Sequence, residues 1–135
     1  MREGYKHLDT SSNSGWQIEC YPHPALIEIF GLDRRLAYKK GRVREKKSGQ
    51  KTFAGYITRL RDSKILGLDI PEGFSQFLEE PRIESLKGSK LKVNEDVLDS
   101  IVILYIAGLF ASSSPGEVYG SAIDGYIYVP KLKCI

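Results

Sequence analysis

The segment from Asn94 to Ser114, NEDVLDSIVILYIAGLFASSS, most strongly constrains how this chain can fold. Its apolar residues fall on nearly every side of a helix, so other elements should cover a helix here on most of its circumference. Asn94 is a favourable N-cap, and the Ser-Ser-Ser-Pro-Gly run at 112–116 is typical of a helix end. We therefore expect a central buried helix that begins at Asn94.

Three acidic residues, Glu95, Asp96 and Asp99, lie at the start of this predicted helix. Acidic side chains in a first turn interact favourably with the helix macrodipole, which is sufficient to explain Glu95 and Asp96. Asp99 lies a turn further in and precedes Val102 and Ile103, where an unpaired charge is costly to bury. Asp96 and Asp99 are three residues apart and project from one face. The acids are therefore either structural or part of a metal or catalytic site.

The composition is that of an ordinary soluble globular protein of one domain, with 135 residues, 41% hydrophobic and 27% charged. The longest apolar run, Ile101–Ala111, is about half of the ~20 residues that a bilayer requires. The N-terminus has no signal-peptide core, so we expect a cytoplasmic location and no membrane contact. Cys20 and Cys134 are too few for a disulfide framework, and with His7 and His23 they form no zinc-type spacing.

The chain in order predicts an N-terminal arm over 1–15 and then a strand over 16–21, WQIECY, with Glu19 near its end. Pro24 favours the first turn of a helix that runs to Gly31, a C′ glycine. Residues 52–90 predict a helical cap, with an amphipathic helix over 52–66 and two proline-interrupted helices after it. Residues 117–120 and 126–130 predict a C-terminal β-hairpin around Asp-Gly.

The positive charge is concentrated in one segment, because nine of the 20 lysines and arginines lie between positions 34 and 51. With two glycines and few apolar residues, the segment is expected to be an exposed basic loop. It can bind a nucleic-acid backbone, since lysines and arginines that meet phosphates release counterions, or it can merely keep the chain soluble. The residues assigned to nucleic-acid binding are Arg34, Arg35, Lys39, Lys40, Arg42 and Arg44.

We expect Glu19, Asp96 and Asp99 to lie near one another, because the strand that carries Glu19 can pack beside the acidic helix. Clustered carboxylates repel each other unless a cation is present, and hard oxygen ligands suit Mg²⁺ or Mn²⁺. The chemistry this favours is metal-assisted phosphodiester hydrolysis, with the three acids as catalytic and metal-binding residues. No Walker or dinucleotide-binding glycine motif is present in the sequence.

Four segments also resemble, in order, the C-terminal two-thirds of a family known as domain of unknown function 429, which is described as predicted RNase H-like nucleases. They are IECYPHPALIEIFGL, RRLAYKKGR, NEDVLDSIVILYIAGLFA and EVYGSAIDGYIYVP, between Trp16 and Pro130. The resemblance implies an α/β, partial RNase H-like fold with few strands, a helical cap and a C-terminal hairpin. It implies a metal-binding Glu19 at the end of the fourth strand, and Asp96 and Asp99 as the acidic pair of the last helix.

Folds of that type begin with a three-stranded meander whose first strand supplies an essential aspartate, and only Glu3 and Asp9 precede the predicted strand here. We therefore expect a nuclease that is incomplete by itself, completed by a partner chain or by homo-oligomer formation at an exposed sheet edge. The alternative is a non-catalytic remnant or interaction module that oligomerises through that edge. A third interpretation is a small-molecule hydrolase that uses Glu19 and His23.

Overall fold

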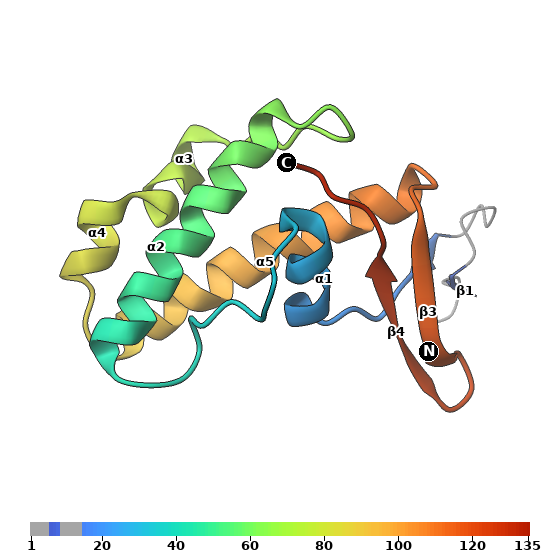
Figure 1. Cartoon of the computed structure of the whole chain (residues 1–135), viewed down its shortest axis with the longest axis horizontal. Coiled ribbons are helices and arrows are strands. Elements are labelled where there is room, and N and C mark those ends of the chain that lie inside the picture. Colours follow the sequence, from blue (N-terminus) through green and yellow to red (C-terminus); the bar gives the residue numbers. More distant parts are fainter. Residues whose placement is uncertain (1–5, 9–14) are drawn as a thin grey trace.

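The computed structural model describes residues 6–8 and 15–135, and within these ranges the chain folds into five α-helices and two small two-stranded sheets (Figure 1). The predicted α/β class is therefore confirmed. The predicted N-terminal arm lies mostly outside the described residues. Among the described residues, no helix is both long and apolar enough to cross a bilayer.

Helix α5, Ser89–Ala111, runs through the middle of the molecule and packs against α1, α2 and β4 (Figure 1). It begins five residues before the predicted start. Gly88, with φ +54°, precedes it as the N-cap, and Leu91 is buried in its first turn. The prediction of Asn94 as the N-cap was wrong, because residues 89–93 contain no helix breaker and supply a buried leucine. The three acids therefore lie inside the helix, and its first turn carries none.

Coverage of α5 is less complete than its apolar composition suggests. Residues spaced three and four apart, including Leu98, Val102 and Leu109, are fully buried. On the opposite face, Ile103 and Leu104 are 40% and 68% exposed. The prediction that other elements cover the helix on most of its circumference was therefore wrong for this face. The helix has one buried stripe.

Helix α1, Pro22–Phe30, packs beside α5 and buries Leu26 and Ile29 completely. Pro22 lies at the start of the helix, where a missing N–H costs nothing. Gly31 adopts the left-handed conformation, with φ +63°, and its N–H bonds back to the last turn. The predicted C′ glycine is confirmed.

Helix α2, Val43–Arg59, corrects the predicted basic loop. Residues 35–38 have no regular secondary structure, but from Val43 onward the loop prediction was wrong. Gly49, Gln50, Phe53 and Ile57 form a buried stripe at helical spacing, while the lysines and arginines point outward. The charges from Arg44 onward belong to an amphipathic helix, which starts nine residues before the predicted one at position 52. It continues as the 3₁₀ turn η1, Leu60–Asp62.

The rest of the predicted cap consists of three short elements, namely α3, Glu72–Ser75, η2, Gln76–Leu78, and α4, Glu80–Ser85. Both η2 and α4 pack on α2, and α3 packs on η2. Asn94 ties them to the long helices. Its Nδ2 donates to Gln50 Oε1 at 3.0 Å and to the Phe77 carbonyl at 3.2 Å, and Arg82 Nη1 donates to Asn94 Oδ1 at 2.6 Å. The residue predicted as a cap is therefore a buried polar junction between α5, α2 and the short helices.

The predicted hairpin is confirmed as β3, Gly116–Ser121, paired antiparallel with β4, Gly125–Pro130. Strand β4 faces α1 and α5, whereas every residue of β3 is exposed. The predicted strand over 16–21 is regular only as β2, Trp16–Gln17, which pairs in parallel with β1, Lys6–His7. Further on, Cys20 forms one parallel bridge to Tyr128.

Candidate functional site

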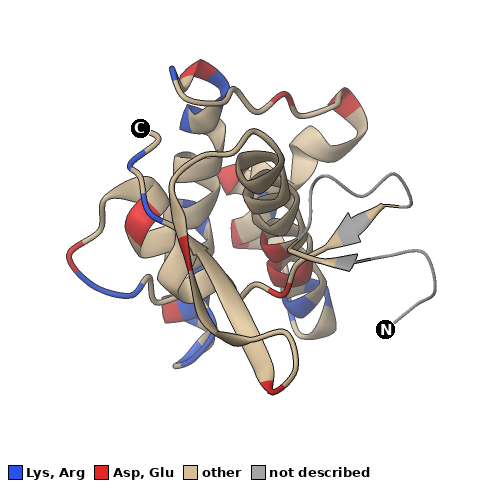
Figure 2. Ribbon diagram, turned by 90° about the vertical axis from the view of Figure 1, so that its right-hand side faces the viewer, with Lys and Arg blue, Asp and Glu red and all other residues tan. Residues whose placement is uncertain are grey.

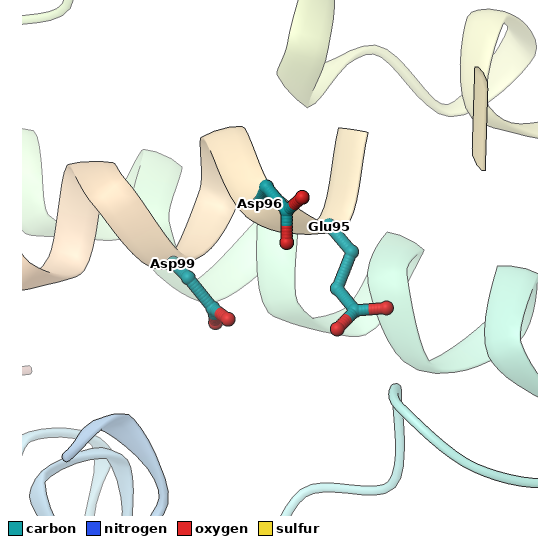
Figure 3. Close-up of side chains that lie close together, drawn as sticks. All are labelled: Glu95, Asp96 and Asp99. Carbon is teal, nitrogen blue, oxygen red and sulfur yellow. The ribbon is translucent and has the colours of Figure 1, made fainter. Parts of the chain in front are cut away.

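The acidic cluster consists of Glu95, Asp96 and Asp99, on consecutive turns of α5 (Figure 3). One carboxylate oxygen from each residue lies within 4.8 Å of the others. Glu95 and Asp99 are four residues apart, so both carboxylates extend from the same side of the helix (Figure 3). These two are buried, at 5% and 9% exposure, while Asp96 is exposed.

Two lysines neutralise most of this charge. Lys39 Nζ forms an ion pair with Asp99 Oδ2 and lies 3.3 Å from Glu95 Oε1. Lys92, on α5 itself, lies 2.9 Å from Glu95 Oε1 and 3.2 Å from Asp96 Oδ1. Three carboxylates face two ammonium groups, so one negative charge remains. Burial is the largest single influence and lowers the pKa of Lys39, but the hydrogen bonds and charges of Asp99 and Glu95 together outweigh it, so the pKa of Lys39 is raised.

Tyr38 fixes the orientation of Asp99, because its hydroxyl donates to Asp99 Oδ1 at 2.6 Å. Its ring is fully buried, with the rings of His23 and Phe53 at centroid distances of 5.3 and 4.6 Å. Burial first, and then the bond to Asp99, raise the pKa of Tyr38 far above its ordinary value. Tyr38 therefore keeps its proton and remains a hydrogen-bond donor to Asp99.

The cluster can hold a metal ion, since its oxygens are close together and Asp96 is open to solvent. Lys39 bridges the two buried carboxylates, which is where a cation that binds both of them would sit. A metal ion would therefore compete with the ammonium of Lys39. Asp96, which contacts the 61%-exposed Lys92, is the most accessible of the three carboxylates.

The structure brings two of the predicted site residues, Asp96 and Asp99, together with Glu95, but Glu19 is not a member of the cluster. The side chain of Glu19 is exposed, and its backbone is held by β4. Its N–H donates to Tyr126 Oη at 3.0 Å, and its carbonyl accepts from the Tyr128 N–H at 2.8 Å. A metal-binding role for Glu19 stays a prediction.

The predicted nucleic-acid-binding residues have two kinds of environment. Arg34, Arg35, Lys40, Arg42 and Arg44 are exposed, the last of them in the first turn of α2. Lys39 is only partly exposed because it extends to the acidic cluster. It thus joins the basic segment to the acids (Figure 2 shows the charged residues on the ribbon). Their binding of nucleic acid stays a prediction.

Sequence reasoning missed Tyr38, Lys92 and His23 as neighbours of the acids, and it explained Glu95 by the macrodipole alone. Lys92 could have been found, because it precedes Glu95 and Asp96 by three and four residues on one helix. Tyr38 could not, since it lies 61 residues from Asp99 and no pattern links them. His23, the suggested partner of Glu19 in a hydrolase, is buried with neither ring nitrogen hydrogen-bonded to another described residue.

The fold and the cluster together define a mixed α/β protein with an acidic site on its central helix that can hold a metal ion. The chain belongs to the family described as Protein of unknown function (DUF429), whose model matches residues 1–121. The match includes all five helices and β3 and ends before β4. Searches of curated proteins and of solved structures give no significant match.

Proposed function

We propose that this chain carries the metal-binding acids of an RNase H-like nuclease, with Asp96, Asp99 and Glu95 as ligands of Mg²⁺ or Mn²⁺. The observation that supports it best is the position of Lys39, which extends from the basic segment into the acidic cluster. A nucleic-acid backbone bound by the exposed cations beside Lys39 would pass next to these carboxylates. Metal-assisted phosphodiester cleavage requires this combination of phosphate binding and a metal site.

The chain's own residues have separable roles in this proposal. When bound, a divalent cation supplies a Lewis acid and an activated water. Tyr38 keeps one oxygen of Asp99 occupied, so the other is left to bind Lys39 or a cation. Asp96, being exposed, presents its oxygens on the side from which substrate arrives.

All three carboxylates come from two turns of one helix, so they can surround only one side of an ion. Ligands for the other side must come from a different element. Glu19 and an acid from a partner chain or a second copy are the candidates, which is why we propose that the site is incomplete by itself. RNase H-like folds use acids from several elements in this way, as the resemblance implies.

The test is calorimetric titration with Mn²⁺ and with Mg²⁺ at low ionic strength. The double variant Asp96→Asn/Asp99→Asn should lose the binding that the wild-type chain has. The matched control, Asp62→Asn/Asp69→Asn, removes the same charge at exposed positions and should bind as the wild type does. No binding by the wild type, or equal binding by both double variants, would falsify the proposal.

Activity is tested separately with end-labelled DNA and RNA in Mn²⁺, using the same variants. Once a partner chain or a second copy supplies the missing ligands, we expect cleavage by the wild type and the control but not by the Asp96→Asn/Asp99→Asn variant. Cleavage only after a partner chain is added would identify the source of the missing ligands.

A second candidate is the non-catalytic module that oligomerises through its sheet edge. The observation that favours it is β3, which is exposed in all six residues and pairs only with β4 among the described strands. The position of Lys39 is compatible with this non-catalytic module, because an ammonium group that pairs with the carboxylates takes the place of a metal ion. Sedimentation should then find a dimer that Val118→Lys disrupts and Ile123→Lys, at the exposed hairpin turn, preserves. Metal-dependent cleavage by the purified chain would exclude this candidate.

A further inference from the structure

Beside the acidic cluster lies a hollow of about 160 Å³ that neither the metal chemistry nor the fold uses. One wall is His23, in the first turn of α1, and the others come from the segment that precedes α2. The lining residues are His23, Arg35, Leu36, Ala37, Tyr38, Lys39 and Lys40. Three of them are cations and none is acidic, so the hollow favours an anion.

The histidine that lines this hollow lacks hydrogen-bond partners for its ring nitrogens among the described residues. It is His23, which is 4% exposed. The rings of Tyr21 and Tyr38 pack beside it, at centroid distances of 5.5 and 5.3 Å. Leaving buried polar atoms unpaired is unfavourable, so such atoms ordinarily have a hydrogen-bond partner. A ligand with acceptor oxygens in the hollow would supply it.

The cations of the hollow are available to such a ligand to different degrees. Arg35 and Lys40 are exposed, and among the described residues neither has a carboxylate within ion-pairing distance. Lys39 also lines the hollow, although its ammonium contacts Glu95 and Asp99. Two uncommitted cations and one shared cation therefore face the same space.

We propose that this hollow binds a phosphate group. A phosphate carries up to two negative charges and acceptor oxygens in several directions, which suits a guanidinium, ammonium groups and a ring N–H that approach from α1 and from the loop. The volume fits as well, since one water fills about 30 Å³ in the liquid and a phosphate is the size of a few waters. The phosphate belongs either to a nucleic-acid end or to a free phosphomonoester. As a substrate subsite it rests on the proposed nuclease function, but binding itself does not.

The test is calorimetric titration with inorganic phosphate, at constant ionic strength and with EDTA present so that no metal takes part. Arg35→Gln/Lys40→Gln should weaken binding at least tenfold. Lys87→Gln/Lys90→Gln, which removes the same charge at exposed positions in and beside the start of α5, should stay within twofold of the wild type. Absence of wild-type binding, or equal losses in the two variants, would overturn the proposal.

Two further arms sharpen the result. His23→Phe keeps a ring but removes both nitrogens, so it should weaken phosphate binding at least threefold. Sedimentation and circular dichroism establish that the variant is folded. Unchanged phosphate affinity in the folded variant would overturn the proposal that this hollow binds phosphate. A 5′-phosphorylated oligonucleotide that displaces phosphate better than its 5′-hydroxyl counterpart identifies a nucleic-acid end as the source. Displacement by phenyl phosphate but by neither oligonucleotide identifies a free phosphomonoester. Since EDTA is present, failure of the metal titration leaves these outcomes intact.

Discussion

Replacing Lys39 by Met tests the acidic cluster most directly, because it removes the charge that the two buried carboxylates share. Methionine keeps an unbranched stem of similar length, so packing around the side chain changes little. In the variant, Asp99 keeps only the hydroxyl of Tyr38, and Glu95 keeps only the exposed Lys92. One negative charge becomes two on the same side of α5.

The size of the effect follows from burial. Breaking a fully buried pair costs about 3–5 kcal/mol, whereas an exposed pair contributes about 0–1 kcal/mol. The side chain of Lys39 is 25% exposed, against 13% for Asp99 and 6% for Glu95, so the pair lies between these limits. We expect Lys39→Met to lower the free energy of unfolding by about 2 kcal/mol in EDTA.

Urea unfolding followed by circular dichroism measures this loss, with Lys87→Met as the control that removes an exposed charge. Saturating Mn²⁺ should restore the variant to near the wild-type value, because a bound cation replaces the missing ammonium. Mn²⁺ should also bind the variant more tightly, by up to about 30-fold if the whole 2 kcal/mol is released. A variant as stable as the wild type in EDTA, or one that Mn²⁺ fails to rescue, would show that Lys39 does not occupy a cation site.

Three further predictions test the framework around the site. Gly49→Ala places a Cβ against the Ala37 carbonyl oxygen and 2.6 Å from Tyr38 Cα, so it should lower the free energy of unfolding in urea by about 3 kcal/mol. Gly55→Ala, whose Cβ has nothing within 4 Å, should raise the same free energy by about 0.5–1 kcal/mol. Asn94→Ala leaves buried hydrogen-bonding groups unpaired and should cost about 2–3 kcal/mol; a loss under 0.5 kcal/mol would contradict the buried junction. Burial first, and then the charges of Arg35 and Lys39, lower the pKa of His23, although Asp99 and Glu95 oppose this shift. As the pH falls below about 6.5, His23 is therefore protonated in the unfolded chain before it is protonated in the folded protein. Stability is then lost between that pH and the lower folded pKa, and His23→Phe should flatten this part of the pH profile of thermal unfolding.

The elements that the sequence predicted well have local causes. Gly31 ends α1 because the left-handed conformation at that position is nearly free for glycine. The Asp124–Gly125 pair turns the hairpin between β3 and β4, since glycine accommodates φ +100° there. In both cases the deciding residues lie within a few positions of the feature that they create.

The errors arose where a strong local feature masked a weaker periodic one. The density of positive charge over 43–51 suggested a loop, but Gly49, Phe53 and Ile57 form the buried stripe of a helix. Asn94 resembled an N-cap because acids follow it, although the stripe of α5 begins at Leu91. Charge sets the solvent-facing side of a helix, whereas its buried stripe fixes its extent.

Only part of the site was accessible to sequence reasoning. Asp96 and Asp99 were found because their spacing on a helix brings them together without any tertiary information. The partners of Asp99 on other elements depend on how the segment before α2 crosses α5. That segment packs directly on Gly49 of α2, where the backbone of Ala37 and Tyr38 passes too close for any side chain. A packing requirement of this kind is visible in the sequence only as a single glycine. It produces no periodic pattern from which the contact could be predicted.

Lys39 belongs both to the acidic cluster and to the proposed phosphate hollow, so the two sites cannot be independent. While its ammonium pairs with Glu95 and Asp99, it contributes little to an anion in the hollow. A cation bound by the carboxylates would release Lys39 toward the phosphate, and a bound phosphate would draw it away from the carboxylates. Linkage requires the two effects to be equal in free energy, so metal and phosphate would each strengthen the binding of the other. A nuclease site of this construction would hold its metal most tightly when the substrate is present.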